Sequence, residues 1–304
     1  MARRVKLIFN PHADRGRAWE IAASLQSLIE RSGGASWSAT EYPTHATELA
    51  EQAAHEGYDI VASLGGDGTV HEVVNGLMRL PPERRPKLGS VPIGSGNDFS
   101  SNAGVSKETE VAMQRLFTGE PRRFDIGKLT DNTGHTEYWD NTLGIGFDAT
   151  VTIRSLQSKR LQGFAMYLWA VILTILRNHE APLMTIKTDR EGFEQEALML
   201  TMCNGPREGG GFFVAPSAKP DDGILDYVII KHVSRLMMFR LIPEVMNGTH
   251  GRFSQVRMGQ FRELNLKLAK PMTIHADGEV MAGFTSSVTE LKVEILPGAL
   301  EVII

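Results

Sequence analysis

The sequence has little of what would point to an exported or a nucleic-acid-binding protein. Its single cysteine, Cys203, excludes an intramolecular disulfide and agrees with a reducing compartment. Because Cys203 ends the apolar run 197–203, we expect it to be a buried packing residue. The net charge of -4 lacks the basic excess that binds phosphate backbones, so no nucleic-acid partner is expected. The N-terminus leads straight into a strand pattern without the apolar region of a signal peptide, which favours a cytoplasmic protein.

No apolar run is long enough to cross a bilayer. The longest, 163–176, falls short of the about 20 residues that a spanning helix needs. Arg154, Lys159 and Arg160 precede this run, and Arg177 follows it. One prediction is a core helix packed on a sheet; the other is a helix whose exposed apolar edge and basic flanks contact a membrane surface. Both predictions can hold for different faces of one helix.

Two glycine-rich loops each follow a predicted buried strand and carry an aspartate. Strand 59–64 leads into Gly-Gly-Asp-Gly-Thr at 65–69, and strand 88–93 leads into Gly-Ser-Gly-Asn-Asp at 94–98. Glycines let the backbone approach a ligand, and free amides at a helix start favour a phosphate. Because Asp67 would repel a polyphosphate unless a divalent cation lay between them, loop 65–69 predicts a Mg-nucleotide site. An Asp-Gly turn explains this loop equally well by itself, but two such loops on one sheet edge favour a ligand.

The length of 304 residues allows two domains with sizeable cores. Residues 1–125 alternate strands and helices, which predicts an α/β domain with a parallel sheet. From 126 the pattern changes to period-two strands, interrupted by helices near 161–177 and 233–247. These strands are expected at 136–141, 183–188, 194–203, 224–230, 264–268, 272–275 and 289–296. We predict a mainly antiparallel β-sandwich over 126–298, with a last strand, 299–304, that could return to the first domain.

Six sequence blocks in this order give the chain a resemblance to a known family. The blocks are Asn10-Pro11, 65–69, 92–99 (Pro-Ile-Gly-Ser-Gly-Asn-Asp-Phe), 204–211, 215–226 and Asp277-Gly278-Glu279. Together they resemble the diacylglycerol kinase catalytic family, in particular the soluble bacterial lipid kinases of the YegS and DgkB type. That group is similar to sphingosine kinases and more distantly to NAD kinases. Ser95 stands where the family usually has threonine, and the hydroxyl is retained.

The resemblance implies ATP-dependent phosphorylation of a lipid hydroxyl, with Mg²⁺ as cofactor. It implies that ATP is bound by Asn10, Thr44, Gly66, Asp67, Gly68, Thr69, Ser95 and Asn97, with Arg17 as a looser candidate. It implies that the catalytic Mg²⁺ is held by Asp67, Asp98 and Asp125, which singly would be a turn residue, a helix cap and a hinge residue. Thr44 is also a plausible helix cap.

The resemblance further implies that Asp277 is the catalytic base and that Glu279 supports it. Gly278 is expected to form a turn between two short strands, so that alternation brings both carboxylates to one side, although an ordinary Asp-Gly hairpin turn is the alternative. A second cation loop resembles the family's structural Mg²⁺ site, with the carbonyls of Lys219 and Ile224 and the side chain of Asp222. The histidines at 71, 232, 250 and 275 show no metal-ligand spacing and are expected to be solvated or packing residues.

Diacylglycerol is the leading acceptor because it is the family's commonest substrate. Phosphatidylglycerol, a sphingoid base or another lipid alcohol would need only a differently shaped apolar pocket. Two further alternatives are an NAD-kinase-like enzyme, which would share Gly66-Asp67-Gly68, and a non-catalytic lipid-binding module. We expect a cytoplasmic protein in peripheral contact with the inner membrane, and a homodimer only by analogy with the family.

Overall fold

The computed structural model describes residues 3–16, 18–157, 161 and 163–304, without the side chains of Asp14 and Arg15. It divides into two compact units, residues 1–125 with 298–304, and residues 126–297. Two long strands, β5 (Pro121–Asp131) and β15 (Glu290–Ile303), pair with each other. Each contains one boundary between the units: β5 the boundary after residue 125, and β15 the boundary after residue 297. Each unit is described below by itself.

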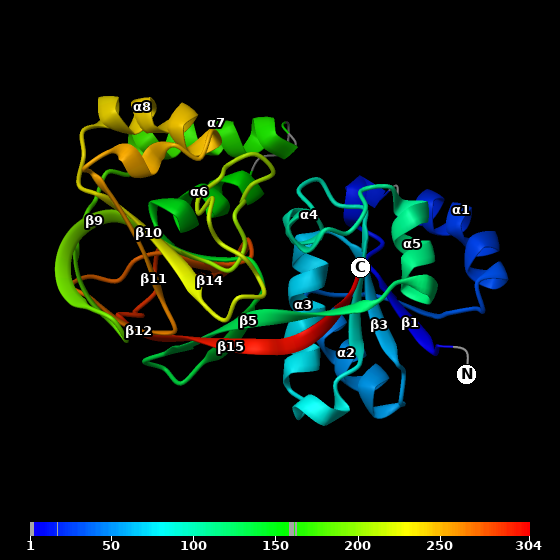
Figure 1. Cartoon of the computed structure of the whole chain (residues 1–304). Helices are drawn as coiled ribbons and strands as arrows, with labels where there is room; N and C mark the ends of the chain where they lie inside the picture. Colours follow the sequence, from blue (N-terminus) through cyan, green and yellow to red (C-terminus); the bar gives the residue numbers. More distant parts are fainter. Residues whose placement is uncertain (1–2, 17, 158–160, 162) are drawn as a thin grey trace. The chain divides into compact units, whose positions relative to one another are not determined.

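The first unit is a parallel sheet with helices on both faces, as Figure 1 shows. The strands lie in the order β2-β1-β3-β4, followed by the end of β15, where Val302 pairs with Leu88. Helix α1 packs with α5, and α2 packs with α3 on the other face of the sheet. The bounds are β1 Val5–Phe9, β2 Ser36–Ala39, β3 Ile60–Gly65, β4 Lys87–Pro92, α1 Ala18–Arg31, α2 His45–His55, α3 Asp67–Met78, α4 Asp98–Ala103 and α5 Thr109–Thr118, with single 3-10 turns at Ala13–Gly16 and Pro82–Arg84.

The buried strands of this sheet explain its stability. All six residues of β3 are buried, as a strand covered by helices on both faces requires. The strand ends set the position of the loops, because β3 and β4 run parallel in register and Gly65 pairs with Pro92. The loops that follow these strands therefore leave the same edge of the sheet.

The second unit is built from antiparallel strands in two sheets. Strand β9 belongs to both, because its first half pairs with β8 and its second half pairs with β7 and β10. Alternating side chains of β8 and β12 are buried, as the period-two pattern predicts. The bounds are β6 Thr136–Trp139, β7 Thr142–Gly146, β8 Leu183–Thr188, β9 Gly192–Cys203, β10 Leu225–Lys231, β11 Val256–Phe261, β12 Glu263–Leu268, β13 Ile274–Ala276 and β14 Glu279–Ala282.

Two buried clusters hold the second unit together. One fills the space between the two sheets and includes Trp139, Tyr227 and Phe261. The other lies between the outer face of β9 and β10 and a layer of three helices, which Figure 1 shows beside these strands. These helices are α6 Phe147–Leu156, α7 Gly163–Arg177 and α8 Arg235–Met246, and a 3-10 turn follows at His250–Arg252. Among the described helices, none is both long and apolar enough to cross a membrane.

The predicted fold class is confirmed, an α/β unit and a mainly antiparallel sandwich, but two local predictions were wrong. The expected strands 289–296 and 299–304 are one strand, β15, which passes through Pro297 and Gly298 without ending. Gly298 adopts a φ of 58° and donates its N–H to Asp125 Oδ1 at 2.7 Å, so the polypeptide turns without leaving the sheet. Helix α6 was not predicted, because its β-branched residues at 150–153 are weak helix formers that tertiary packing overrides.

Candidate active site

The two glycine loops of the first unit contact each other through their backbones. A Cβ atom placed on Gly94 would lie 2.4 Å from the Cα of Gly66, and one placed on Gly66 would lie 3.2 Å from the Cα of Gly94. Only glycine allows this approach, because any side chain would force the loops apart. The structure therefore brings together the two loops that the sequence predicted to share a sheet edge.

Asp67 and Asp98 border one small space between these loops. Each is the first residue of its helix, α3 or α4. A Cβ atom on Gly96 would lie 2.8 Å from Asp67 Oδ2 and 3.9 Å from Asp98 Oδ2. Asp67 Oδ1 accepts a hydrogen bond from the N–H of Phe99 at 3.1 Å, which ties the first loop to the second helix. Two carboxylates around one space offer the oxygen ligands that a divalent cation takes.

Polar side chains fix the shape of the loops. Asn97 Oδ1 accepts the N–H of Gly94 at 3.0 Å, and its Nδ2 donates to the Gly94 carbonyl at 2.7 Å. Asn10, which follows β1, donates from Nδ2 to Thr69 Oγ1 at 3.3 Å. Within the two loops, Gly68 is partly exposed and Ser95 is exposed. Asn10, Thr69 and Asn97 thus lie at the loops, while their contact with ATP stays a prediction. Arg17 lies outside the described residues.

Three non-glycine residues in the described chain have a positive φ, and all three are predicted site residues. They are Thr44 (70°), Asn97 (53°) and Asp277 (50°). A positive φ is uncommon for a β-branched residue, and such backbone strain concentrates at functional sites. The capping prediction for Thr44 was wrong in its mechanism. Thr44 precedes α2, but its side chain makes no capping hydrogen bond, and its N–H donates to Glu72 Oε1 at 3.0 Å.

Asp125 is buried on β5, where its Oδ1 accepts the Gly298 N–H. The roles of Asp125 as a magnesium ligand and as a hinge residue stay predictions. The second cation loop forms a local turn: Asp222 Oδ1 accepts the N–H of Ile224 at 3.2 Å, and Gly223 has a φ of 73°. Lys219 and Asp222 are both exposed on the same loop, and Pro220 between them is buried.

In the second unit, Asp277 and Gly278 are the two turn residues of the hairpin between β13 and β14. Ala276 pairs with Glu279, and the φ angles of 50° and 90° at the turn fit a type I′ hairpin. The Asp277 carboxylate accepts three backbone hydrogen bonds of 2.9 Å, from the N–H groups of Asp140, Asn141 and Thr142. These donors hold the carboxylate in one orientation.

The expected relation between Asp277 and Glu279 was wrong. Strand alternation was expected to bring both carboxylates to one side, but Asp277 lies in the turn and not in a strand. Asp277 is 9% exposed, whereas Glu279 is exposed on β14. The two carboxylates therefore have different surroundings.

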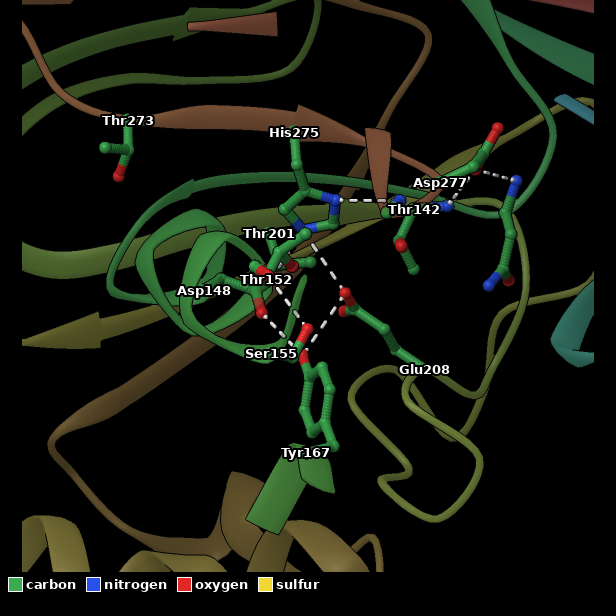
Figure 2. A network of polar contacts seen from close by, with 12 residues as sticks. Thr142, Asp148, Thr152, Ser155, Tyr167, Thr201, Glu208, Thr273, His275 and Asp277 are labelled. Carbon is green, nitrogen blue, oxygen red and sulfur yellow. Dashed lines mark hydrogen bonds and ion pairs between the residues drawn. The ribbon is translucent and has the colours of Figure 1, made fainter. Parts of the chain in front are cut away.

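A buried polar cluster adjoins this turn, and the sequence analysis missed it (Figure 2). His275 Nε2 lies 3.2 Å from Glu208 Oε1 and 3.5 Å from Asp148 Oδ2, and its side chain is fully buried. Asp148 accepts hydrogen bonds from Thr201 Oγ1 at 2.6 Å and from the Tyr167 hydroxyl at 3.2 Å. The prediction that His275 is a solvated or packing residue was wrong. We refer to His275, Asp148, Glu208, Tyr167 and Thr201 as the histidine cluster.

The charges of the histidine cluster control its protonation. Burial alone would lower the pKa of His275, but the facing carboxylates of Glu208 and Asp148 outweigh burial and raise that pKa to about 10. Burial would raise the pKa of Asp148, but its contacts with His275 lower it. The N–H of Gly278 lies 3.2 Å from His275 Nδ1, where a neutral ring would accept it, and this contact opposes a second ring proton. Two full negative charges exceed one amide dipole, so the raised pKa is the direction that prevails.

The sequence did hold a signal for Asp148. It follows Gly144-Ile145-Gly146-Phe147 at the junction of β7 and α6, the same order of strand, glycines, carboxylate and helix as in the first unit. Of the other histidines, His71 is buried with its ring beside Asn75, and His250 is buried with Nε2 2.9 Å from the Val214 carbonyl. His232 is exposed, so these three agree with a packing or solvated role. Cys203 is buried, as predicted.

An apolar pocket lies against the histidine cluster within the second unit. Its open space, including the part that reaches solvent, is about 630 Å³. Asp148 and Tyr167 belong to its wall, and their polar groups bond inside the cluster. The other lining side chains are apolar and come mainly from α6, α7, α8 and the strands beneath them, among them Val151, Val171, Ile175, Leu198, Phe212, Met238, Leu241 and Val245.

Comparison with known proteins agrees with this architecture. Residues 4–129 match the diacylglycerol kinase catalytic domain, and residues 141–304 match the YegS C-terminal NAD kinase beta sandwich-like domain. A YegS-like protein of Chromohalobacter salexigens, named a probable lipid kinase, is 33% identical over 83% of this chain and 78% of its own. The diacylglycerol kinase of Bacillus subtilis is 28% identical over 91% of this chain and 90% of its own.

A crystal structure from Bacillus anthracis, of a protein assigned as a diacylglycerol kinase, superposes with a TM-score of 0.80 at 25% identity. It covers 99% of this chain and 97% of its own. Two glycine loops, two convergent aspartates and a YegS-type sandwich thus occur in one chain, and this chain belongs to the diacylglycerol kinase family of the YegS type.

Proposed function

We propose that the chain is an ATP- and Mg²⁺-dependent lipid kinase that transfers the γ-phosphate to a lipid hydroxyl, with diacylglycerol as the leading acceptor and phosphatidic acid as product. The observation that carries this proposal is the backbone contact between Gly66 and Gly94, with Asp67 and Asp98 bordering one space. The relatives named diacylglycerol kinase support it, because they align with nearly the whole chain.

Phosphoryl transfer depends on positioning and charge neutralisation, and the loops of the first unit fit both needs. Backbone amides at the start of α3 would face the phosphates, where the helix dipole favours negative charge. Asp67 and Asp98 would hold Mg²⁺, which supplies neutralisation of the phosphate charge when bound. The roles of Asn10, Thr44, Thr69, Ser95 and Asn97 at the nucleotide are part of this proposal.

Asp277 is the proposed base in the second unit. A hydroxyl that attacks phosphorus loses its proton, and a carboxylate held in one orientation is suited to accept it. The three backbone N–H donors supply that orientation. Glu279, on the adjacent strand, is the proposed supporting carboxylate, and Lys219, Asp222 and Ile224 remain the proposed second cation loop.

The apolar pocket is the proposed site for the acyl chains. Binding of an acyl chain there would be stabilised by about 25 cal/mol for each Å² of apolar surface that it removes from water. Asp148 lies in the wall and Glu208 next to it, and both carboxylates contact His275, so two carboxylates face one cation. This excess of negative charge favours a neutral acceptor such as diacylglycerol over anionic phosphatidylglycerol.

Peripheral contact with the inner membrane is the second part of the proposal. Helices α7 and α8 line the pocket with one face, through Val171, Ile175 and Leu241. On other faces they expose large apolar side chains, with Trp169 51% and Leu236 80% exposed. Arginines at 177, 235 and 240 on the same helices would attract anionic lipid.

The test of the activity is phosphorylation of a panel of acceptors with labelled ATP and Mg²⁺. The panel contains diacylglycerol, phosphatidylglycerol, sphingosine and NAD, each with the wild type and with Asp277→Ala. We expect labelled phosphatidic acid from the wild type and none from the folded variant. Label in NAD alone would assign an NAD-kinase-like enzyme, and label in no acceptor despite lipid binding would assign a non-catalytic module.

The test of membrane contact is sedimentation with vesicles of phosphatidylcholine and phosphatidylglycerol. Trp169→Ser combined with Leu236→Ser should lower the bound fraction several-fold, whereas Leu183→Ser, an exposed leucine on β8, should not. Equal binding by all three proteins would contradict a membrane role for α7 and α8.

A further inference from the structure

His275 connects the wall of the apolar pocket to the turn that carries Asp277. On one side of the ring, Nδ1 lies 3.2 Å from the backbone nitrogen of Gly278, the residue after Asp277. On the other side, Nε2 lies 3.2 Å from Glu208 Oε1. The ring is fully buried, so water does not compete for either contact.

Glu208 and Asp148 continue this path to the pocket wall. The Tyr167 hydroxyl donates to Asp148 Oδ1 at 3.2 Å and contacts Glu208 Oε1 at 3.4 Å. Tyr167 and Asp148 both line the pocket. Figure 2 shows the Tyr167 ring below the two carboxylates and His275 above them.

Three glycines make room for this arrangement. A Cβ atom on Gly144 would lie 2.2 Å from His275 Nε2 and 2.5 Å from Asp148 Oδ2. One on Gly209 would lie 2.8 Å from the Tyr167 ring, and one on Gly211 would lie 2.6 Å from the Phe164 ring. The strand β7 and the loop after Glu208 therefore leave space for the cluster and for the aromatic rings of α7.

We propose that His275 is a positioning residue for phosphoryl transfer, which sets the Asp277–Gly278 turn in place relative to the acceptor pocket. The inference rests on the proposed lipid kinase function and adds to it a residue that touches neither ATP nor the reacting hydroxyl. At Nδ1 the buried ring packs against the turn, and at Nε2 it faces Asp148 in the pocket wall and Glu208 next to it. A displacement of either partner moves the proposed base relative to the acceptor.

Two substitutions separate the two contacts. In His275→Gln the amide nitrogen reaches the place of Nε2, so the contact with the carboxylates is kept and the contact with Gly278 is lost. In His275→Asn the amide oxygen takes the place of Nδ1, so the contact with Gly278 is kept and the carboxylates lose their partner. We expect Gln to lower kcat by about 10- to 100-fold with the lipid KM little changed, because a displacement of about 1 Å has an effect of that size. We expect Asn to raise the lipid KM, with the KM for ATP unchanged.

A further pair of variants, a test and its control, each removes one tyrosine hydroxyl. Tyr167→Phe removes the hydroxyl from the cluster but keeps the ring in the pocket wall, and it should lower kcat several-fold. Tyr227→Phe removes a buried hydroxyl that contacts Glu191 and Arg257, away from the cluster, and should leave kcat unchanged. If the His275 variants do not fold, the comparison of these two phenylalanine variants decides the inference.

The kinetics are measured per folded protein, with the folded fraction taken from thermal unfolding. A wild type that phosphorylates lipid, together with variants whose kcat and lipid KM equal the wild-type values, overturns the positioning role alone. A wild type that phosphorylates no lipid overturns the proposed function, and this inference with it.

Discussion

Gly94→Ala tests the contact between the two glycine loops, on which the proposed nucleotide site depends. The added Cβ would lie 2.4 Å from Gly66 Cα and 3.0 Å from Asn97 Oδ1. Carbon atoms in contact normally lie about 3.5–4.0 Å apart, so the two backbones must separate by about 1 Å or more. The nearest atom belongs to the backbone, so no side-chain rotation relieves the clash.

The size of the effect follows from this displacement. Overpacking of a tight contact costs roughly 1–3 kcal/mol in the free energy of unfolding. The same shift moves Asp67 away from Asp98, because each begins the helix that follows its loop. A misplacement of about 1 Å at a catalytic group lowers the rate by about 100-fold. We therefore expect kcat/KM for ATP to fall by about 100-fold while the folded protein remains the main species.

The assay is lipid phosphorylation at varied ATP, with urea unfolding measured in parallel. Gly192→Ala is the matched control, because its Cβ would lie 3.9 Å from the Ile186 carbonyl, an ordinary contact. The control should keep the wild-type kcat/KM. A Gly94→Ala protein with the wild-type kcat/KM for ATP would refute the reasoning. Catalysis would then not depend on the close contact between the two loops.

Three further predictions concern charge and burial. Asp67→Asn should keep the fold, because the amide oxygen still accepts the Phe99 N–H. It should lower kcat by about 100-fold or more and raise the Mg²⁺ concentration needed for half-maximal activity. An unchanged Mg²⁺ dependence would show that Asp67 is not a metal ligand. The pKa of His275 is raised in the folded state, so its stabilising effect is full below about pH 6.5 and is lost as the pH rises towards about 10. The free energy of unfolding should therefore fall more steeply between those pH values in the wild type than in His275→Gln, and parallel curves would contradict the buried ion pair. Burial raises the pKa of the Cys203 thiol well above its usual value, so a thiol reagent should label it only after denaturation; rapid labelling of the native protein would show that the strand opens.

Much of the fold followed from local patterns in the sequence. Strands with alternating burial, such as β8 and β12, were placed within a residue of their observed bounds, because period two is set by the pleat itself. The continuous strand β15 was divided at Pro297 and Gly298, because its pairing with distant strands keeps it extended where the local signal predicts a break. Helix α6 escaped prediction for the same reason, since packing against α7 and β7 outweighs its weak propensity.

The sequence alone determined the two glycine loops, their place at one sheet edge and the turn at Gly278 between two short strands, because each depends on neighbouring residues or on the rule that parallel strands end at one edge. Tertiary structure alone decided the histidine cluster. His275 faces Asp148 because β13 pairs with β7 so that His275 lies opposite Gly144, which has no side chain to occupy the space. Antiparallel register between segments far apart in the chain leaves no local trace, and so the charged partners of His275 became visible only in the folded protein.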